Sequence, residues 1–130
     1  MAKVFFVRNE KDLPFADWIV DGVKVIETRN RRTLSALAGT GERVYIARTG
    51  HGKPVVIGTC VLSIPYHCPV ESFGRCRFLH KVPAGSKYDA GPAGKWFYDI
   101  WDAERVEPFD LPADAIRHGR VWAEFNLEEA

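Results

Sequence analysis

The chain has few of the features that membrane-spanning, secreted or disulfide-linked proteins depend on. Its apolar runs fall far short of the roughly 20 residues that a transmembrane helix needs. The N-terminus has only four consecutive apolar residues, 4–7, too few for the apolar region of a secretory signal. Three cysteines, an odd number, argue against a disulfide framework and for a reducing environment. We therefore expect a cytoplasmic protein with no membrane partner.

Length and composition predict one globular domain over residues 1–130. A chain of 130 residues is long enough for one hydrophobic core and too short for two. Its 46% hydrophobic and 27% charged residues are typical of folded rather than disordered proteins. No sequence feature specifies an oligomeric state.

The small net charge of +1 conceals an uneven distribution along the chain. Residues 1–95 hold 15 Lys/Arg against 8 Asp/Glu, whereas residues 96–130 hold 3 against 9. Basic residues gather at Arg29, Arg31 and Arg32, and such a cluster is suited to phosphate groups. The alternative is an ordinary solvated surface on which both signs of charge are interspersed.

Hydrophobic periodicity predicts a mainly β (α+β) chain. We expect helices at 14–20 and 69–79, a helical turn at 33–37 and a Gly/Pro-rich loop at 84–94. Asp12 is a candidate N-cap for the first helix, and Gly22 a stop for it. Strands are predicted at 4–7, 23–29, 43–47, 54–66, 96–101 and 121–127, with a bend at Gly58. Short strands with glycine-marked bends favour a β-barrel of about five or six strands with flanking short helices.

The segment 22–29, Gly-Val-Lys-Val-Ile-Glu-Thr-Arg, sets three charges among apolar residues. On an ideal strand Glu27 and Arg29 share one face, and Lys24 lies on the other. Lys24 and Glu27 therefore meet only if the strand bends or ends between them. Charges on both faces indicate a cleft mouth or barrel end, where a rigid strand can present a ligand site. The alternative is an edge strand stabilised by salt bridges.

The chain resembles the ASCH family, small PUA-like β-barrels related to RNA-binding domains. The resemblance is carried by Trp18-Ile19 and by Gly22-x-Lys24-x-x-Glu27-x-Arg29, which is similar to the family's GxKxxExR signature. It continues in the segments 44–47, 55–61, 96–98 and 107–109. The resemblance implies an ASCH-type, PUA-like barrel spanning nearly the whole chain.

The same resemblance implies candidate catalytic residues. One branch similar to this family removes the acetyl group from N4-acetylcytidine, with a catalytic lysine at the position of Lys24. That branch has a threonine where this chain has Glu27, and a later glutamate assists. Glu71 is the only acidic residue between Glu42 and Asp89, so it is the candidate for the later role. Other members that the chain resembles are ribonucleases, which a Lys/Arg cluster can support without metal.

Aromatic and basic residues near the predicted closing strand are candidates for ligand binding. Tyr98 and Trp96 can stack on a base, and Lys95 lies beside them in the sequence. Most tryptophans in a small barrel belong to its core, which is the alternative for Trp96. The loop 85–91 is either a lid that carries Tyr88 as a stacking group or an ordinary surface loop.

No metal or other cofactor is predicted. The cysteines and histidines between residues 60 and 80 lack a CxxC pair and match no common zinc module. The hypothesis favoured by these observations is a cleft that binds RNA or a modified nucleoside or nucleotide through Lys24, Glu27 and Arg29. The alternatives are an amidohydrolase acting on N4-acetylcytidine-type nucleosides, a metal-independent ribonuclease, and a protein-interaction barrel in which the charged strand is structural.

Overall fold

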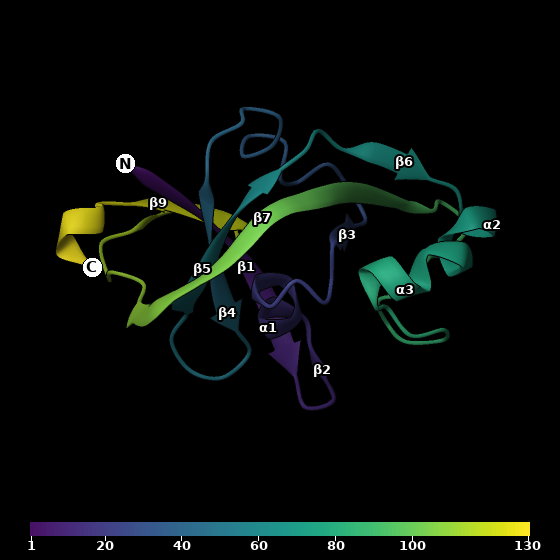
Figure 1. Cartoon of the computed structure of the whole chain (residues 1–130), viewed down its shortest axis with the longest axis horizontal. Helices are drawn as coiled ribbons and strands as arrows, with labels where there is room; N and C mark the ends of the chain where they lie inside the picture. The colour runs from purple at the N-terminus through teal and green to yellow at the C-terminus, as the bar shows by residue number, and fades with distance from the viewer.

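One curved sheet contains all the strands of the computed structural model, which describes residues 1–130 (Figure 1). The strands are β1 (Ala2–Glu10), β2 (Leu13–Pro14), β3 (Ile26–Arg29), β4 (Val44–Thr49), β5 (Val55–Leu62), β6 (Tyr66–Cys68), β7 (Lys95–Asp110), β8 (Ile116–His118) and β9 (Trp122–Phe125). Nine strands replace the expected five or six because β2, β6 and β8 are pieces of two or three residues, too short for an alternating pattern to mark.

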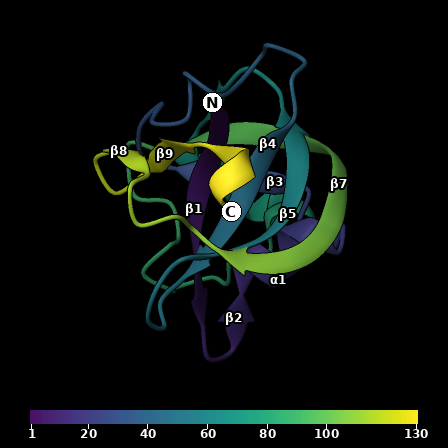
Figure 2. The same ribbon diagram turned by 90° about the vertical axis from the view of Figure 1, so that its left-hand side faces the viewer.

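The main path of the sheet runs β3-β7-β5-β4-β1-β9-β8, with β2 added to β1 and β6 added to β7. Every pair is antiparallel except β1 with β4, which are parallel and are separated in sequence by the first helix and β3. Seen from the end that holds both termini, the strands curve around a common interior (Figure 2). The predicted mainly β fold with short helices is confirmed.

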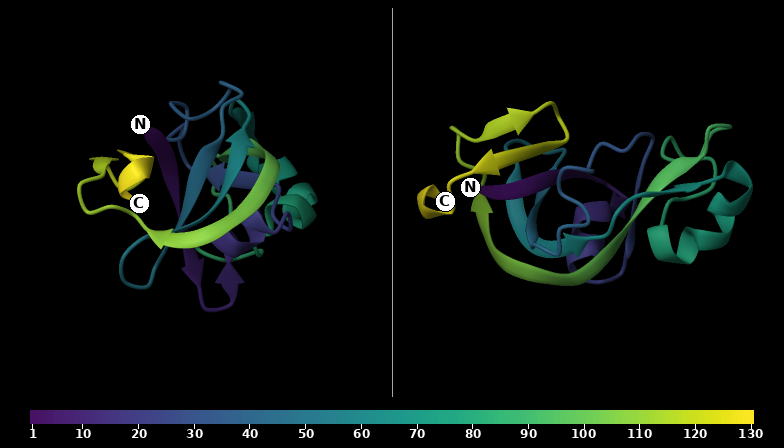
Figure 3. Two further views of the ribbon diagram at one scale, coloured as in Figure 1. Left: turned by 60° about the vertical axis from the view of Figure 1, so that its left-hand side comes forward. Right: turned by 90° about the horizontal axis from the view of Figure 1, so that it is seen from above.

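Strand β7 joins the two ends of the molecule (Figures 1 and 3). Its first residues pair with β3 on one side and β6 on the other, and its later residues pair with β5. The β5–β7 register shifts at Gly58, where the sequence predicts a bend. A Cβ at this position would meet the Val20 side chain and lie 2.5 Å from the Glu104 carbonyl oxygen, so only glycine fits.

Strand alternation builds a core on both faces of β1. Phe5 and Val7 pack in the larger cluster, which includes the helix residue Ile19, whereas Val4 and Phe6 pack with Phe125 in a smaller one. Each large apolar side chain that is fully buried in this way contributes about 1.5–3 kcal/mol. The helix α1 (Phe15–Val20) closes the larger cluster, in which Phe15, Ala16, Ile19 and Val20 are buried.

Helix α1 begins later than predicted, and its cap is different. Pro14 precedes the helix and offers no side-chain cap, so the expectation that Asp12 is the N-cap is wrong. The short pairing of β2 with β1 draws this segment into the sheet, and the Asn9 side chain accepts a hydrogen bond from the Ala16 N–H at 2.8 Å. Gly22 adopts a φ of 75° just after the helix, as expected for a stop.

The second predicted helix is broken into three pieces: α2 (Val70–Phe73), a 3-10 turn η1 (Gly74–Cys76) and α3 (Arg77–His80). Another 3-10 turn, η2 (Leu127–Glu129), closes the chain. The pieces α2 and α3 lie beside β6, at the opposite end of the molecule from the termini (Figure 1). None of the helices has the length and apolar character needed to cross a membrane.

Candidate functional site

A cavity of about 310 Å³ opens between β1, β3 and the start of β7. Its apolar and aromatic lining residues are Val7, Phe15, Val82 and Tyr88, and Phe6 borders the cavity with its side chain packed in the smaller core cluster. The remaining lining is polar and contains five basic side chains but only one carboxylate. These residues are Arg8, Lys24, Glu27, Thr28, Arg29, Asn30, Thr49, Lys95 and Arg120. The size suits a small ligand or one unit of a larger one.

Lys24 enters this cavity from the segment between α1 and β3. The N–H groups of Val23 and Lys24 both donate to the Trp18 carbonyl, at 2.8 and 3.0 Å, so the strand begins only at Ile26. The predicted strand over 23–29 is therefore shorter. Because Lys24 lies outside the regular strand, its side chain reaches the same side as Glu27, which fulfils the condition that the sequence sets for their meeting.

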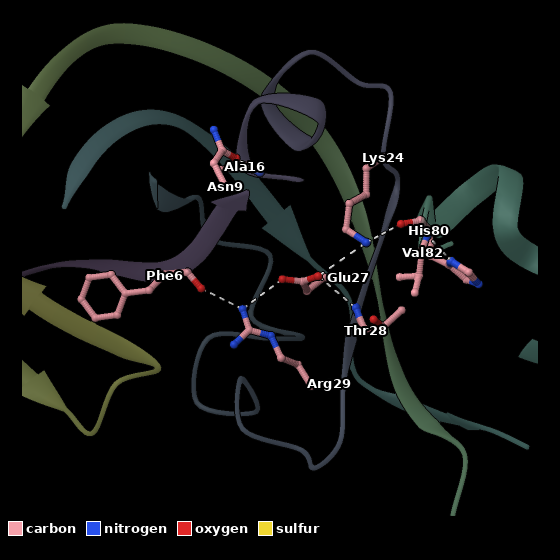
Figure 4. Close-up of polar contacts among 9 residues, drawn as sticks. All are labelled: Phe6, Asn9, Ala16, Lys24, Glu27, Thr28, Arg29, His80 and Val82. Carbon is pink, nitrogen blue, oxygen red and sulfur yellow. Dashed lines mark hydrogen bonds and ion pairs between the residues drawn. The ribbon is translucent and has the colours of Figure 1, made fainter. Parts of the chain in front are cut away.

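The buried ion cluster of this site consists of Lys24, Glu27 and Arg29 (Figure 4). Lys24 is 1% exposed; its Nζ donates to the His80 carbonyl at 2.5 Å and lies 3.6 Å from Glu27 Oε1. Arg29 Nη2 contacts Glu27 Oε2 and the Phe6 carbonyl, each at 2.9 Å. The Glu27 carboxylate thus connects the two cations and orients both.

Burial and pairing act in opposite directions on the pKa values of the cluster. Burial lowers the pKa of Lys24 to about 8, although the neighbouring Glu27 charge opposes the shift. Burial alone would raise the pKa of Glu27, but Arg29 and Lys24, with hydrogen bonds from Arg29 and the Thr28 N–H, lower it overall. Glu27 is therefore ionised at neutral pH, and Lys24 is the group whose charge is most easily lost.

His80 fixes the carbonyl that receives Lys24. Its Nδ1 accepts the Val82 N–H at 2.9 Å, so Nε2 carries the proton and donates to the Phe73 carbonyl at 2.9 Å. The Phe73 ring stacks on the imidazole with centroids 4.1 Å apart. The sequence singles out His80 only as a member of a weak metal pattern, and its position beside Lys24 carries no local signal.

Two further predicted residues lie at the cavity. Lys95 is 6% exposed, and burial lowers its pKa. Tyr88 comes from the predicted loop and lies edge-on to Phe15, with centroids 5.4 Å apart. The Tyr88 hydroxyl donates to Glu10 Oε1 at 2.8 Å, which attaches the loop to the end of β1.

Other predicted ligand residues do not reach the cavity. Tyr98 is fully buried, and its hydroxyl accepts the Leu34 N–H at 3.0 Å, so it is a core residue. Trp96 follows Lys95 on β7 and lies on the other side, where the Arg32 guanidinium stacks over its ring at 5.0 Å. Arg31 and Arg32 line this separate, open surface together with Trp96. The basic cluster seen in the sequence is thus divided between the cavity, which holds Arg29, and the outer surface.

Glu71 is also placed away from the cavity. It lies exposed in the first turn of α2 and does not line the site. The break of the predicted helix at Gly74 means that only α3 approaches Lys24, through His80. Glu71 therefore lies apart from the cavity that holds Lys24.

Sequence reasoning missed several lining residues because they come from distant segments. Phe6 and Arg8 belong to β1, Val82 follows α3, and Arg120 precedes β9. Alternation along β1 indicates which of its residues share a face, but no pattern within the sequence places Arg120 beside them.

Comparison with known proteins identifies the fold. No protein-family model matches the chain, and no curated protein matches it. Among solved structures, ASCH from Zymomonas mobilis superposes with a TM-score of 0.73 at 23% identity, covering 98% of this chain and 90% of that one. Two mutants of the same protein give TM-scores of 0.72 and 0.71 at 23% and 22% identity, covering 98% and 97% of this chain and 92% and 90% of theirs. The chain therefore has the ASCH-domain fold.

Proposed function

We propose that this ASCH-fold chain binds RNA or a nucleotide in the cavity that contains Lys24, Glu27 and Arg29. The observation that carries the proposal is the lining itself, in which five basic residues and one carboxylate accompany the aromatic residues Phe15 and Tyr88. Such a lining attracts an anion and can hold a planar ring against its apolar side chains. A nucleotide unit combines these two features.

The roles within the site follow from the contacts. Tyr88, partly exposed and edge-on to the buried Phe15 ring, is the aromatic side chain that suits a base, since base–aromatic stacking contributes about 1–3 kcal/mol. Glu27 orients Lys24 and Arg29, because both cations contact its carboxylate. Arg8, with 60% of its side chain exposed, lies at the mouth, where a phosphate of a longer strand would pass.

The proposal is tested by titrating short single-stranded RNA against the protein over a range of salt concentrations. If phosphates contact the basic lining, the logarithm of the association constant falls with the logarithm of salt, with a slope of about −0.7 for each contact. Arg8→Gln should weaken binding and reduce this slope by about one contact. Lys11→Gln, an exposed lysine outside the cavity, is the matched control. Absence of binding at low salt would overturn the proposal.

A hydrolase is the second candidate, and the lowered pKa of Lys24 favours it. With a pKa of about 8, about a tenth of Lys24 is neutral at pH 7 and able to act as a base. Thr28 lines the same cavity. Incubation with N4-acetylcytidine, and separately with RNA in the presence of a chelator, tests the amidohydrolase and ribonuclease alternatives. Turnover that Lys24→Met abolishes in a folded variant would establish catalysis; binding without turnover supports the proposal above.

A further inference from the structure

The cations of the cavity differ in whether the protein itself neutralises them. Lys24 and Arg29 both contact Glu27 and each donates to a backbone carbonyl. Arg8 lies 3.3 Å from Glu10. Lys95 has no hydrogen bond or ion pair to any group of the chain, although it is more than nine-tenths buried.

The local backbone holds Lys95 at the cavity. It is the first residue of β7 and pairs with Cys68 of β6. The preceding Gly94 has a φ of 72°, and a Cβ there would collide with the Cys68 carbonyl oxygen. Glycine is therefore required for the turn that begins β7 at this position. The side chain of Lys95 lines the cavity, whereas that of its neighbour Trp96 lies outside it.

The acidic groups nearest to Lys95 are already engaged. Glu27 is shared by Lys24 and Arg29. Asp89 accepts Arg77 Nη2 at 3.1 Å and the N–H groups of Gly85 and Ala90. Both carboxylates act on Lys95 only at a distance, and burial lowers its pKa despite them. A cation that has little exposed surface and no protein partner is suited to bind an anion that enters the cavity.

The ammonium group is open to the cavity. The only enclosed side-chain polar atom without a hydrogen-bond partner is Ser86 Oγ, so Lys95 Nζ, which also has no partner, is not sealed within the protein. Arg120, an exposed residue before β9, lines the same cavity and makes no ion pair or hydrogen bond to the protein. Two cations without protein partners therefore face one cavity.

We propose that Lys95, assisted by Arg120, anchors a phosphate monoester, so that the cavity selects phosphorylated ligands over their unphosphorylated counterparts. Two unneutralised cations match the charge of about −2 of a monoester near neutral pH better than the single charge of a carboxylate or phosphodiester. This inference rests on the proposed function for the rest of the ligand. It assigns the anion to Lys95 instead of to the paired Lys24 and Arg29.

The experiment measures by calorimetry, at low salt and pH 7, the affinities of the four nucleoside 5′-monophosphates, the four nucleosides and inorganic phosphate. We expect the wild type to prefer at least one monophosphate over its nucleoside by about tenfold or more, as for a charge-assisted hydrogen bond. Lys95→Gln should reduce the ratio of the two affinities to near one. The separate variant Lys95→Arg, which keeps the charge, should retain most of the wild-type ratio. Lys11→Gln is the control and should retain the wild-type ratio.

The outcomes separate this inference from the proposed function. Equal affinity of the wild type for monophosphate and nucleoside, or an unchanged ratio in Lys95→Gln, overturns the role of Lys95 and leaves nucleotide binding standing. Binding of inorganic phosphate that Lys95→Gln abolishes, with no nucleoside, nucleotide or RNA bound, supports the anion site and overturns the proposed function. If the protein binds none of these compounds and no RNA, both the role of Lys95 and the proposed function are overturned. Should Lys95→Gln fail to fold, the wild-type ratio and Lys95→Arg still decide the question.

Discussion

Two clusters of ion pairs flank helix α1, and they differ in burial rather than in chemistry. The buried ion cluster of Lys24, Glu27 and Arg29 has side chains that are 1%, 8% and 21% exposed. The exposed cluster joins Arg105 of β7, 46% exposed, to Asp17 and Asp21, 25% and 45% exposed. The contacts of the exposed cluster are 2.7–2.9 Å long, and those of the buried cluster are 2.9 Å for Arg29 and 3.6 Å for Lys24 with Glu27.

The comparison shows that contact length is a poor guide to energetic importance. Water and salt screen the exposed cluster, and such pairs typically contribute about 0–1 kcal/mol. In the buried ion cluster Lys24 and Glu27 have lost most of their hydration, so the loss of Glu27 leaves the Lys24 charge buried and uncompensated. The same burial lowers the pKa of Lys24, which links the stability of this cluster to the chemistry of the cavity.

The largest expected effect is that of Glu27→Gln. Removing this carboxylate charge leaves Lys24 and Arg29 buried without a counter-charge, and we expect the free energy of unfolding to fall by about 3–5 kcal/mol. Asp21→Asn, which weakens the exposed cluster, is the matched control, with an expected loss below about 1 kcal/mol. Urea denaturation of both variants measures the difference. Equal losses would remove the distinction between the two clusters.

The pH dependence of stability sharpens the comparison. The pKa of Lys24 is about 8 in the folded protein and ordinarily 10.5, so between these values the unfolded chain binds more protons. Its contribution to the free energy of unfolding therefore rises as pH increases from about 8 to 10.5, by an amount on the order of 1–3 kcal/mol.

This contribution has to be isolated, because the pKa values of the buried Cys60 thiol and of the exposed Tyr66 hydroxyl are also shifted in the alkaline range. Their raised pKa values, that of Cys60 reaching about 12, act in the opposite direction. The quantity to measure is the difference in the free energy of unfolding between the wild type and Lys24→Met at several pH values. The free energy of unfolding of the wild type should rise relative to that of Lys24→Met above pH 8, and the difference should stay constant between pH 6 and 7. A flat profile up to pH 10.5 would contradict the assigned pKa.

The smallest effect is expected for Arg105→Gln. Although Arg105 makes three hydrogen bonds to Asp17 and Asp21, it is exposed, so the thermal midpoint should fall by no more than a few degrees. The decrease should shrink as salt is raised from 0.05 to about 0.5 M, since the Debye length shortens to about 4 Å and the charges of this exposed cluster are screened more strongly. A large decrease that does not depend on salt would show that the exposed cluster contributes as much to stability as the buried ion cluster, and would contradict the comparison.

Much of the fold was accessible from local patterns. The strands that include Val4–Val7 and Val44–Ala47 can be predicted because their apolar runs and the turn residues that flank them are local features of the sequence. Glycine signals predict a helix end at Gly22 and a strand bend at Gly58, because glycine readily adopts the positive φ found at Gly22 and leaves room for the close contacts found at Gly58. The Asp12 cap failed because Asn9, on a neighbouring strand, supplies the hydrogen bond instead.

The sequence by itself determined that Lys24, Glu27 and Arg29 follow a helix stop within one short segment, because their spacing and the Gly22 signal are local; it left open whether Lys24 meets Glu27. Only the tertiary structure decided what surrounds them. The carbonyl that holds Lys24 belongs to His80, 56 residues away, and the same strand β7 sends Lys95 into the cavity and Tyr98 into the core. Alternation along a strand separates its two faces, but the segments packed against each face determine which side chains meet a ligand and which are buried.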